Sequence, residues 1–125
     1  MPAMMTLLNA LDALRNEMAA VAQNAFDACE NDGDFRGNLS SRIAKAIAEL
    51  LYERLGDIDV YTECENWHTW NVVTRMGEAY AVDISPSTYG AWNGLSFESI
   101  GDAIFSGADI VILPEDEFSP EDEDA

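Results

Sequence analysis

The stretch from residue 67 to residue 84, WHTWNVVTRMGEAYAVDI, constrains the fold most, because it has the pattern of a β-hairpin. Its β-branched and aromatic residues favour strands, and the Met-Gly-Glu segment at 76–78 predicts the turn between them. The first strand contains His68, the only histidine of the chain, and the returning strand contains Asp83. The hairpin therefore contains two side chains that are able to form a catalytic or structural pair.

Whether His68 and Asp83 lie on the same face depends on the length of the turn. Side chains alternate between the two faces of a sheet, and directly paired residues share a face. A two-residue turn within 76–78 places both side chains on one face, displaced along it by one or two side-chain steps. A three-residue turn would place them on opposite faces. The same alternation puts Trp70 on the face of His68 and Trp67 on the other face.

Two amphipathic helices are predicted before the hairpin. Between Pro2 and about Cys29, apolar residues recur at spacings of three and four, which is the pattern of a helix with one buried stripe. A second helix ends near Leu55, and Asn38 or Ser40 is its expected N-cap. The stripe of the first helix consists of Leu7, Leu8, Leu11, Leu14, Met18, Val21, Ala22 and Ala25.

Further segments complete the predicted fold. Alternation over residues 57–61 indicates a half-buried strand, and the apolar run at 110–113 indicates a buried one. Helical spacing at 97–105 predicts a short helix. Seven of the eleven residues from 115 to 125 are acidic, which predicts a disordered tail. We expect one globular α+β domain, residues 1–114, with two N-terminal helices packed on a mostly antiparallel sheet.

The charge of the chain is strongly negative and unevenly distributed. Twenty-four acidic residues against six basic ones give a formal net charge of −18 at pH 7. All six bases lie in the first 75 residues, whereas the last 50 contain twelve acids and no base. Such a chain repels nucleic acid and anionic membranes and attracts basic proteins. We therefore expect no direct nucleic-acid binding, no membrane association, and a basic partner.

The two cysteines, Cys29 and Cys64, do not form a disulfide framework or a CxxC motif, and one histidine cannot build a zinc site alone. No apolar run approaches the ~20 residues that span a bilayer, and the N-terminus lacks the pattern of a signal peptide. We expect reduced thiols, no metal or cofactor, and a cytoplasmic protein, which would lie in the host-cell cytoplasm if it is encoded by a phage.

Three positions have the residues of a known enzyme motif. His68-Thr69-Trp70 is similar to a His-x-Trp motif, and Ala81-Val82-Asp83-Ile84 is similar to an apolar-Asp-apolar motif on the next strand. Both motifs are typical of the transglutaminase-like and papain-like fold. The resemblance to this fold covers less than half of the chain. Matching the helix ends puts Ser41 where that family has its cysteine nucleophile. The resemblance implies a hydrolase or transferase using Ser41, His68 and Asp83, although a serine needs a well-placed base and an oxyanion hole.

The charge favours a different function, that of an acidic, non-enzymatic protein that binds the basic, nucleic-acid-binding surface of a partner. Duplex DNA has one negative charge per ~1.7 Å of axis, so a carboxylate surface can mimic it and compete for the same cations. In size and charge alone, the chain is similar to anti-CRISPR or anti-restriction inhibitors of phages and mobile elements, and to immunity proteins that neutralise cationic nuclease toxins. A third possibility is a domain that oligomerises through the stripe of the first helix. The expected contact residues are Trp67, Glu78, Tyr89, Trp92, Glu98, Asp102, Asp109, Glu115, Asp116 and Glu117.

Overall fold

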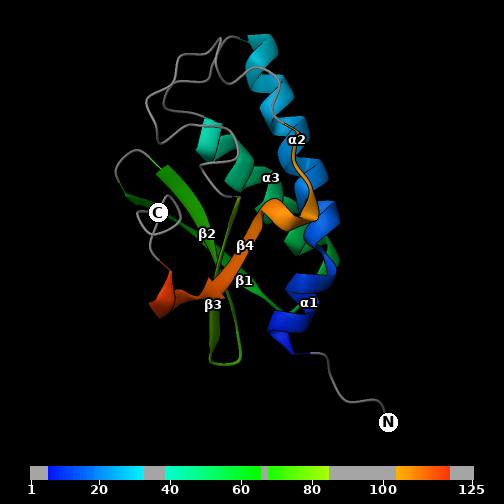
Figure 1. The fold of residues 1–125 in the computed structure, drawn as a ribbon. Helices are drawn as coiled ribbons and strands as arrows, with labels where there is room; N and C mark the ends of the chain where they lie inside the picture. Colours follow the sequence, from blue (N-terminus) through cyan, green and yellow to red (C-terminus); the bar gives the residue numbers. More distant parts are fainter. Residues whose placement is uncertain (1–5, 33–38, 66–67, 85–103, 119–125) are drawn as a thin grey trace.

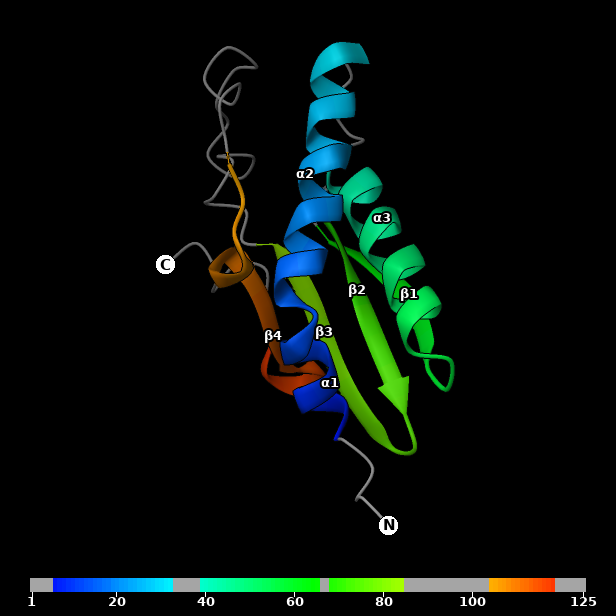
Figure 2. The ribbon, with the colours of Figure 1, turned by 90° about the vertical axis from the view of Figure 1, so that its right-hand side faces the viewer.

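The computed structural model describes residues 6–32, 39–65, 68–84 and 104–118. In these ranges, three α-helices cover one face of a four-stranded antiparallel sheet, in which the strand order is β1-β2-β3-β4 (Figures 1 and 2). The α+β class expected from the sequence is thus confirmed. The elements are α1 (Leu7–Ala13), α2 (Arg15–Asp32), α3 (Leu39–Arg54), β1 (Asp59–Glu65), β2 (His68–Arg75), β3 (Glu78–Ile84) and β4 (Ile110–Pro114), with short 3-10 helices η2 (Gly107–Asp109) and η3 (Glu115–Glu117).

The first predicted helix is two helices, because Leu14 interrupts it with φ −99° and ψ 7°. Thr6 caps α1 by accepting a hydrogen bond from Asn9 N at 3.1 Å. Arg15 begins α2, and its guanidinium donates to the carbonyl of Ile110 at 2.5 Å, which attaches the break to the start of β4. The expectation of one continuous helix was wrong because a one-residue break leaves the apolar spacing almost unchanged.

The main core lies between the helices and one face of the sheet. Leu7, Leu11 and Met18, from the predicted stripe, are fully buried in it, whereas Leu8 is 40% exposed. Because most of the stripe is inside the molecule, it does not provide an oligomerisation surface. Burying each large apolar side chain contributes about 1.5–3 kcal/mol. The sheet contributes Val73, Val82, Ile84, Ile110 and Ile112, and α3 contributes Leu39, Ile43, Ile47, Leu50 and Leu51.

The hairpin of β2 and β3 has a two-residue turn, Met76-Gly77, as the register pair of Arg75 with Glu78 shows. Both turn residues have positive φ, 51° for Met76 and 87° for Gly77. Such a turn matches the right-handed twist of paired strands. The structure thus selects the shorter of the turn lengths considered from the sequence.

Other helices and strands begin or end at residues that differ from those predicted. β1 spans residues 59–65 instead of 57–61, because only Val60 of this strand packs against the main core and the sequence signal fades beyond it. Ser40 lies inside the first turn of α3 and is not its N-cap, because the helix begins at Leu39. The predicted strand at 110–113 is confirmed as β4, one residue longer.

Two predictions fall mostly or partly outside the described residues. Of the predicted helix at 97–105, only the last two residues are described, and neither is helical. The predicted tail begins with η3, and Phe118 then packs its ring against Trp70, with ring centroids 5.0 Å apart. The chain therefore remains folded on the sheet up to Phe118, beyond the expected domain boundary, and residues 119–125 are not described.

Candidate functional site

The sheet has one face toward the helices and one face away from them. In β2, Thr69 and Val73 face the helices, because Thr69 bonds to α3 and Val73 lies in the main core. Trp70 and Val72 alternate with them and belong to a separate apolar cluster. We call the second side the outer face. Its sheet residues, by alternation and register, are Asp59, Tyr61, Glu63, Glu65, His68, Trp70, Val72, Thr74, Ala79, Ala81, Asp83, Val111 and Leu113.

His68 and Asp83 form a buried pair on this outer face. His68 Nε2 lies 2.5 Å from Asp83 Oδ2, and the residues are only 2% and 4% exposed. The other carboxylate oxygen, Oδ1, accepts from Ile84 N at 2.8 Å, and the imidazole stacks on Trp70 with ring centroids 6.1 Å apart. The shared face predicted from the sequence is confirmed. The carboxylate and the indole together fix the orientation of the imidazole.

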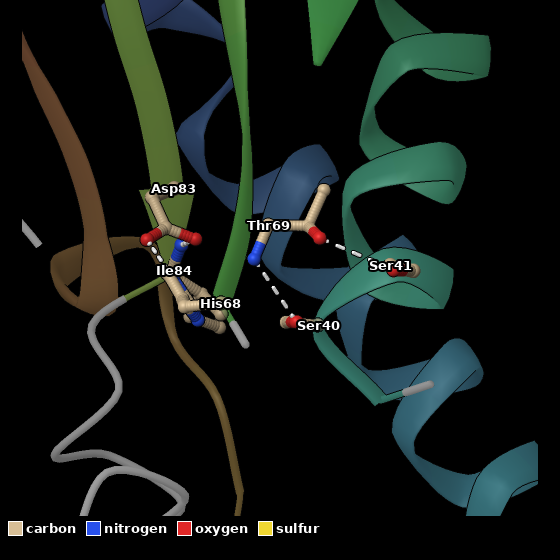
Figure 3. A network of polar contacts seen from close by, with 6 residues as sticks. All are labelled: Ser40, Ser41, His68, Thr69, Asp83 and Ile84. Atoms are coloured by element: carbon tan, nitrogen blue, oxygen red, sulfur yellow. Dashed lines mark hydrogen bonds and ion pairs between the residues drawn. The ribbon is translucent and has the colours of Figure 1, made fainter. Parts of the chain in front are cut away.

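Ser41 lies on the other side of the sheet from this pair. Its hydroxyl oxygen is 3.2 Å from Thr69 Oγ1, and the neighbouring Ser40 Oγ accepts from Thr69 N at 3.1 Å. Consecutive strand residues point to opposite faces, so Thr69 faces α3 while His68 faces outward with Asp83 (Figure 3). The structure therefore brings His68 and Asp83 together but does not bring Ser41 to them. Ser40 and Ser41 instead attach the start of α3 to β2.

The exposed thiol of Cys64 is also separated from the pair. Cys64 is directly opposite Thr69 in the β1–β2 register, so it lies on the side of the sheet that faces the helices. A cysteine there cannot replace Ser41 as a nucleophile for His68. In the described part of the chain, neither Ser41 nor Cys64 lies on the side of the sheet where His68 pairs with Asp83.

The strand β1 places three carboxylates and one tyrosine on the outer face. Asp59, Tyr61, Glu63 and Glu65 alternate along the strand, and all four are exposed. The Tyr61 hydroxyl donates to Glu115 Oε2 at 3.1 Å, which connects β1 to η3. Partial desolvation, this hydrogen bond and the negative charges of Glu115 and Glu63 raise the pKa of Tyr61 above its ordinary value.

The residues of η3 add to this negative surface. Glu115 reaches Tyr61, and Phe118 packs on Trp70, so the segment 115–118 lies over the outer face. The side chains of η3 are exposed. We call the acidic surface formed by the two segments the acidic face. It consists of Asp59, Glu63 and Glu65 of β1, and Glu115, Asp116 and Glu117 of η3.

The described basic residues are on the opposite side of the sheet. Arg75 is at a helix-facing position of β2, where its guanidinium lies 3.8 Å from Asp57 and 3.9 Å from Glu78. The other described bases lie on the helices, and they are Arg15, Arg42, Lys45 and Arg54. Within the described ranges, the outer face therefore contains no lysine or arginine to neutralise its carboxylates.

The predicted contact residues have three different outcomes. Glu78 is near Arg75, and Asp109 accepts from Ser106 N at 2.7 Å, so these two carboxylates have structural partners. Glu115, Asp116 and Glu117 are exposed on the acidic face. The remaining predicted residues lie outside the described ranges, and they are Trp67, Tyr89, Trp92, Glu98 and Asp102.

Sequence reasoning missed the carboxylates of β1. Their signal was visible as the alternation D-x-Y-x-E-x-E over residues 59–65, but a strand was expected only up to Tyr61. On an edge strand whose exposed side is charged, the useful pattern is the alternation of charge, because few apolar residues mark the buried side.

Comparisons with known proteins add no information about the site. No protein-family model matches the sequence, and comparisons with curated proteins and with solved structures find no significant match. Among the described residues, no group of three or more His, Cys, Asp or Glu side chains is arranged to hold a metal ion. None of the helices in these ranges has the length and apolar character needed to cross a membrane.

Proposed function

We propose that this protein is an acidic interaction protein that binds the basic, nucleic-acid-binding surface of a partner and thereby excludes nucleic acid from it. The observation that supports this most is the acidic face, where carboxylates from β1 and η3 lie on one side of a folded sheet. The described bases are on the other side, so this negative field is not cancelled locally. Such a field attracts cationic surfaces and accelerates their association.

The spacing of the carboxylates suits a surface that normally binds phosphates. Along a strand, side chains on one face repeat every two residues, or about 6.8 Å. Glu63 and Glu65 follow this repeat, and η3 adds three further acids close to Tyr61. Lysines and arginines that bind the phosphates of DNA are able to pair with carboxylates arranged in this way. The acidic face would then act as a mimic of the nucleic-acid backbone.

Tyr61 gives this surface an aromatic contact residue. Its side chain is exposed (43% of the residue), and its hydroxyl is oriented by Glu115. Tyrosine is among the residues that contribute most to protein–protein binding, because it combines a large apolar ring with a hydrogen-bonding group. A guanidinium of the partner would stack on the ring while it pairs with Glu63 or Glu115.

The negative charge of the acidic face indicates which class of partner fits it, namely a protein with a cationic surface. An inhibitor of a CRISPR or restriction complex and an immunity protein for a cationic nuclease toxin both bind surfaces of this kind, and we favour the first. The exposed free thiol of Cys64 suits a reducing compartment, so we place this binding in the cytoplasm, which is that of the host if the protein is phage-encoded.

Two charge-reversal variants test the proposal because they change the net charge equally. Glu63→Lys/Glu65→Lys changes the acidic face, whereas Glu49→Lys/Glu53→Lys changes two exposed residues of α3. Each immobilised protein would be exposed to a bacterial lysate at low and high salt, with and without added duplex DNA. The retained proteins would then be identified by mass spectrometry.

We expect the unmodified chain and the α3 variant to retain the same nucleic-acid-binding proteins at low salt and to release them at high salt. The β1 variant should lose them, and added DNA should compete with retention. Equal loss from both variants would show that only net charge matters and would contradict a defined surface. Retention of proteins that do not bind nucleic acid would contradict the mimicry.

A further inference from the structure

Within the described ranges, Val60 is the one residue of β1 with a hydrogen-bonded outward edge. Val60 N donates to Tyr52 Oη at 2.8 Å, and the Tyr52 hydroxyl donates back to Val60 O at 3.1 Å. Both backbone groups of Val60 therefore point away from β2, toward a side chain of α3. This contact satisfies the edge where the strand starts, as side chains and loops commonly do in natural sheets.

Beyond Val60, no described residue pairs with the same edge. In an antiparallel pair, the residues whose N–H and C=O groups point away from the partner strand alternate along the chain. Thr62 and Cys64 follow Val60 in this alternation, and both are exposed. In the described sheet, β1 is the last strand on its side, and no described residue provides hydrogen-bond partners for these four backbone groups. They form a short template for another extended segment.

The charges next to this edge determine which segment fits. Glu63 lies between these two positions, Glu65 follows them, and both glutamates point to the outer face. In an added strand, the residues opposite these two glutamates would lie on the same face and two residues apart. We propose that a segment of the partner adds to β1 as a fifth strand and places Lys or Arg opposite Glu63 and Glu65.

This inference rests on the proposed function, and it adds how the basic partner is recognised. A second copy of the chain is disfavoured at the same edge, because pairing of two β1 strands would bring their glutamates together, and like charges across strands are destabilising. Each chain also has a net charge of −18, which opposes self-association. The charge therefore selects a cationic segment.

A defined peptide tests this mode of binding without knowledge of the natural partner. The probe is an acetylated and amidated peptide of four Lys-Thr repeats, whose lysines share one face when it is extended. The matched control is the same peptide N-methylated at every threonine, which keeps the charge but removes the N–H groups that would pair with β1. Binding is measured by titration, and amide exchange is measured by NMR on the full chain.

We expect the parent peptide to bind and to slow the exchange of the Thr62 and Cys64 amides at least tenfold. The N-methylated peptide should bind at least tenfold more weakly. Cys64→Pro should weaken binding similarly, because it removes an outward N–H and leaves the β1–β2 bonds intact, whereas Cys64→Ala should not. The N-methylated peptide keeps the test decisive even if Cys64→Pro fails to fold.

Other results would reject either this inference or the proposed function. Equal binding of the two peptides, lost in Glu63→Lys/Glu65→Lys, would leave an electrostatic surface and overturn strand addition. Unchanged binding of the parent peptide to that charge-reversal variant would count against the proposed function itself. A dimer in sedimentation experiments without peptide, with the same two amides protected, would show that a second copy is the occupant.

Discussion

The two faces of the sheet differ in what their side chains do. The helix-facing side contains Val73, Val82 and Ile84, and it is closed by three helices. The outer face contains the buried His68–Asp83 pair and, at its edge, exposed carboxylates around Tyr61. The larger apolar core thus lies on one side of the sheet, whereas the other side has a smaller apolar cluster around Trp70 and Val72 beside the charged groups available to a partner. Substitutions on the two faces should therefore have different consequences.

The largest expected effect is on the helix-facing core. Ile47 in α3 is 1% exposed, and Ile47→Ala should lower the free energy of unfolding by about 3–4 kcal/mol, through lost burial and the cavity that remains. Leu113 on the outer face is 38% exposed, and Leu113→Ala should cost less than about 1 kcal/mol. Urea unfolding monitored by circular dichroism would measure both values.

Equal losses of unfolding free energy in these two variants would contradict the predicted difference between the two faces. Such a result would mean that the outer face contributes as much apolar burial as the core, and it could not then serve mainly as a binding surface. The slope of the unfolding transition should stay the same in both variants, so that the change in midpoint reports stability alone.

A smaller effect is expected at the polar pair of the outer face. Asp83→Ala should lower the free energy of unfolding by about 2–3 kcal/mol, because it leaves the buried imidazole of His68 without the carboxylate. Ser41→Ala should cost less than about 1 kcal/mol, because its bond to Thr69 is exposed. Chemical denaturation of each variant at pH 7 would give both numbers.

A double-mutant cycle measures how strongly His68 and Asp83 depend on each other for stability. If His68 and Asp83 act as a unit, the loss in His68→Ala/Asp83→Ala should be clearly smaller than the sum of the single losses. Additive losses would show that each residue is held by other contacts. A cycle between Ser41 and His68 should give no coupling, because the sheet separates them.

Much of the fold was predictable because its signals are local. Apolar spacing marked the helices, and the alternation around the Met76-Gly77 turn determined which residues of the hairpin share a face. The break at Leu14 was not predictable from such patterns, because it leaves the apolar spacing almost unchanged, and the contact beside it joins Arg15 to Ile110, 95 residues away in sequence. Periodicity contains no information about contacts at this distance.

The candidate site was predictable only in part, for a related reason. Parity within one hairpin was enough to pair His68 with Asp83. The position of Ser41 depended on which face of the sheet α3 covers, and the motif match could not reveal it. The link between Tyr61 and Glu115 joins residues 54 apart, and charge counting found the acids of η3 but not their neighbours on β1.

The smallest expected effect concerns Tyr61 on the acidic face. Its raised pKa, relative to an ordinary value of about 10, comes partly from Glu115, so Glu115→Gln should lower the pH at which this phenol ionises. The folded state favours the neutral phenol, so its contribution to stability is present below the ordinary value and is lost as pH rises through the raised one. The phenolate absorbance of the chain minus that of Tyr61→Phe isolates this titration from the other tyrosines.

Glu117→Gln is the matched control for this titration, because it removes one charge from the same 3-10 helix while the bond from Tyr61 to Glu115 remains. The control should shift the Tyr61 titration less than Glu115→Gln does. If both variants shift it equally, only the general field of the acidic face acts on the phenol. If neither does, the contact between β1 and η3 is absent in solution, and the acidic face is reduced to the carboxylates of β1.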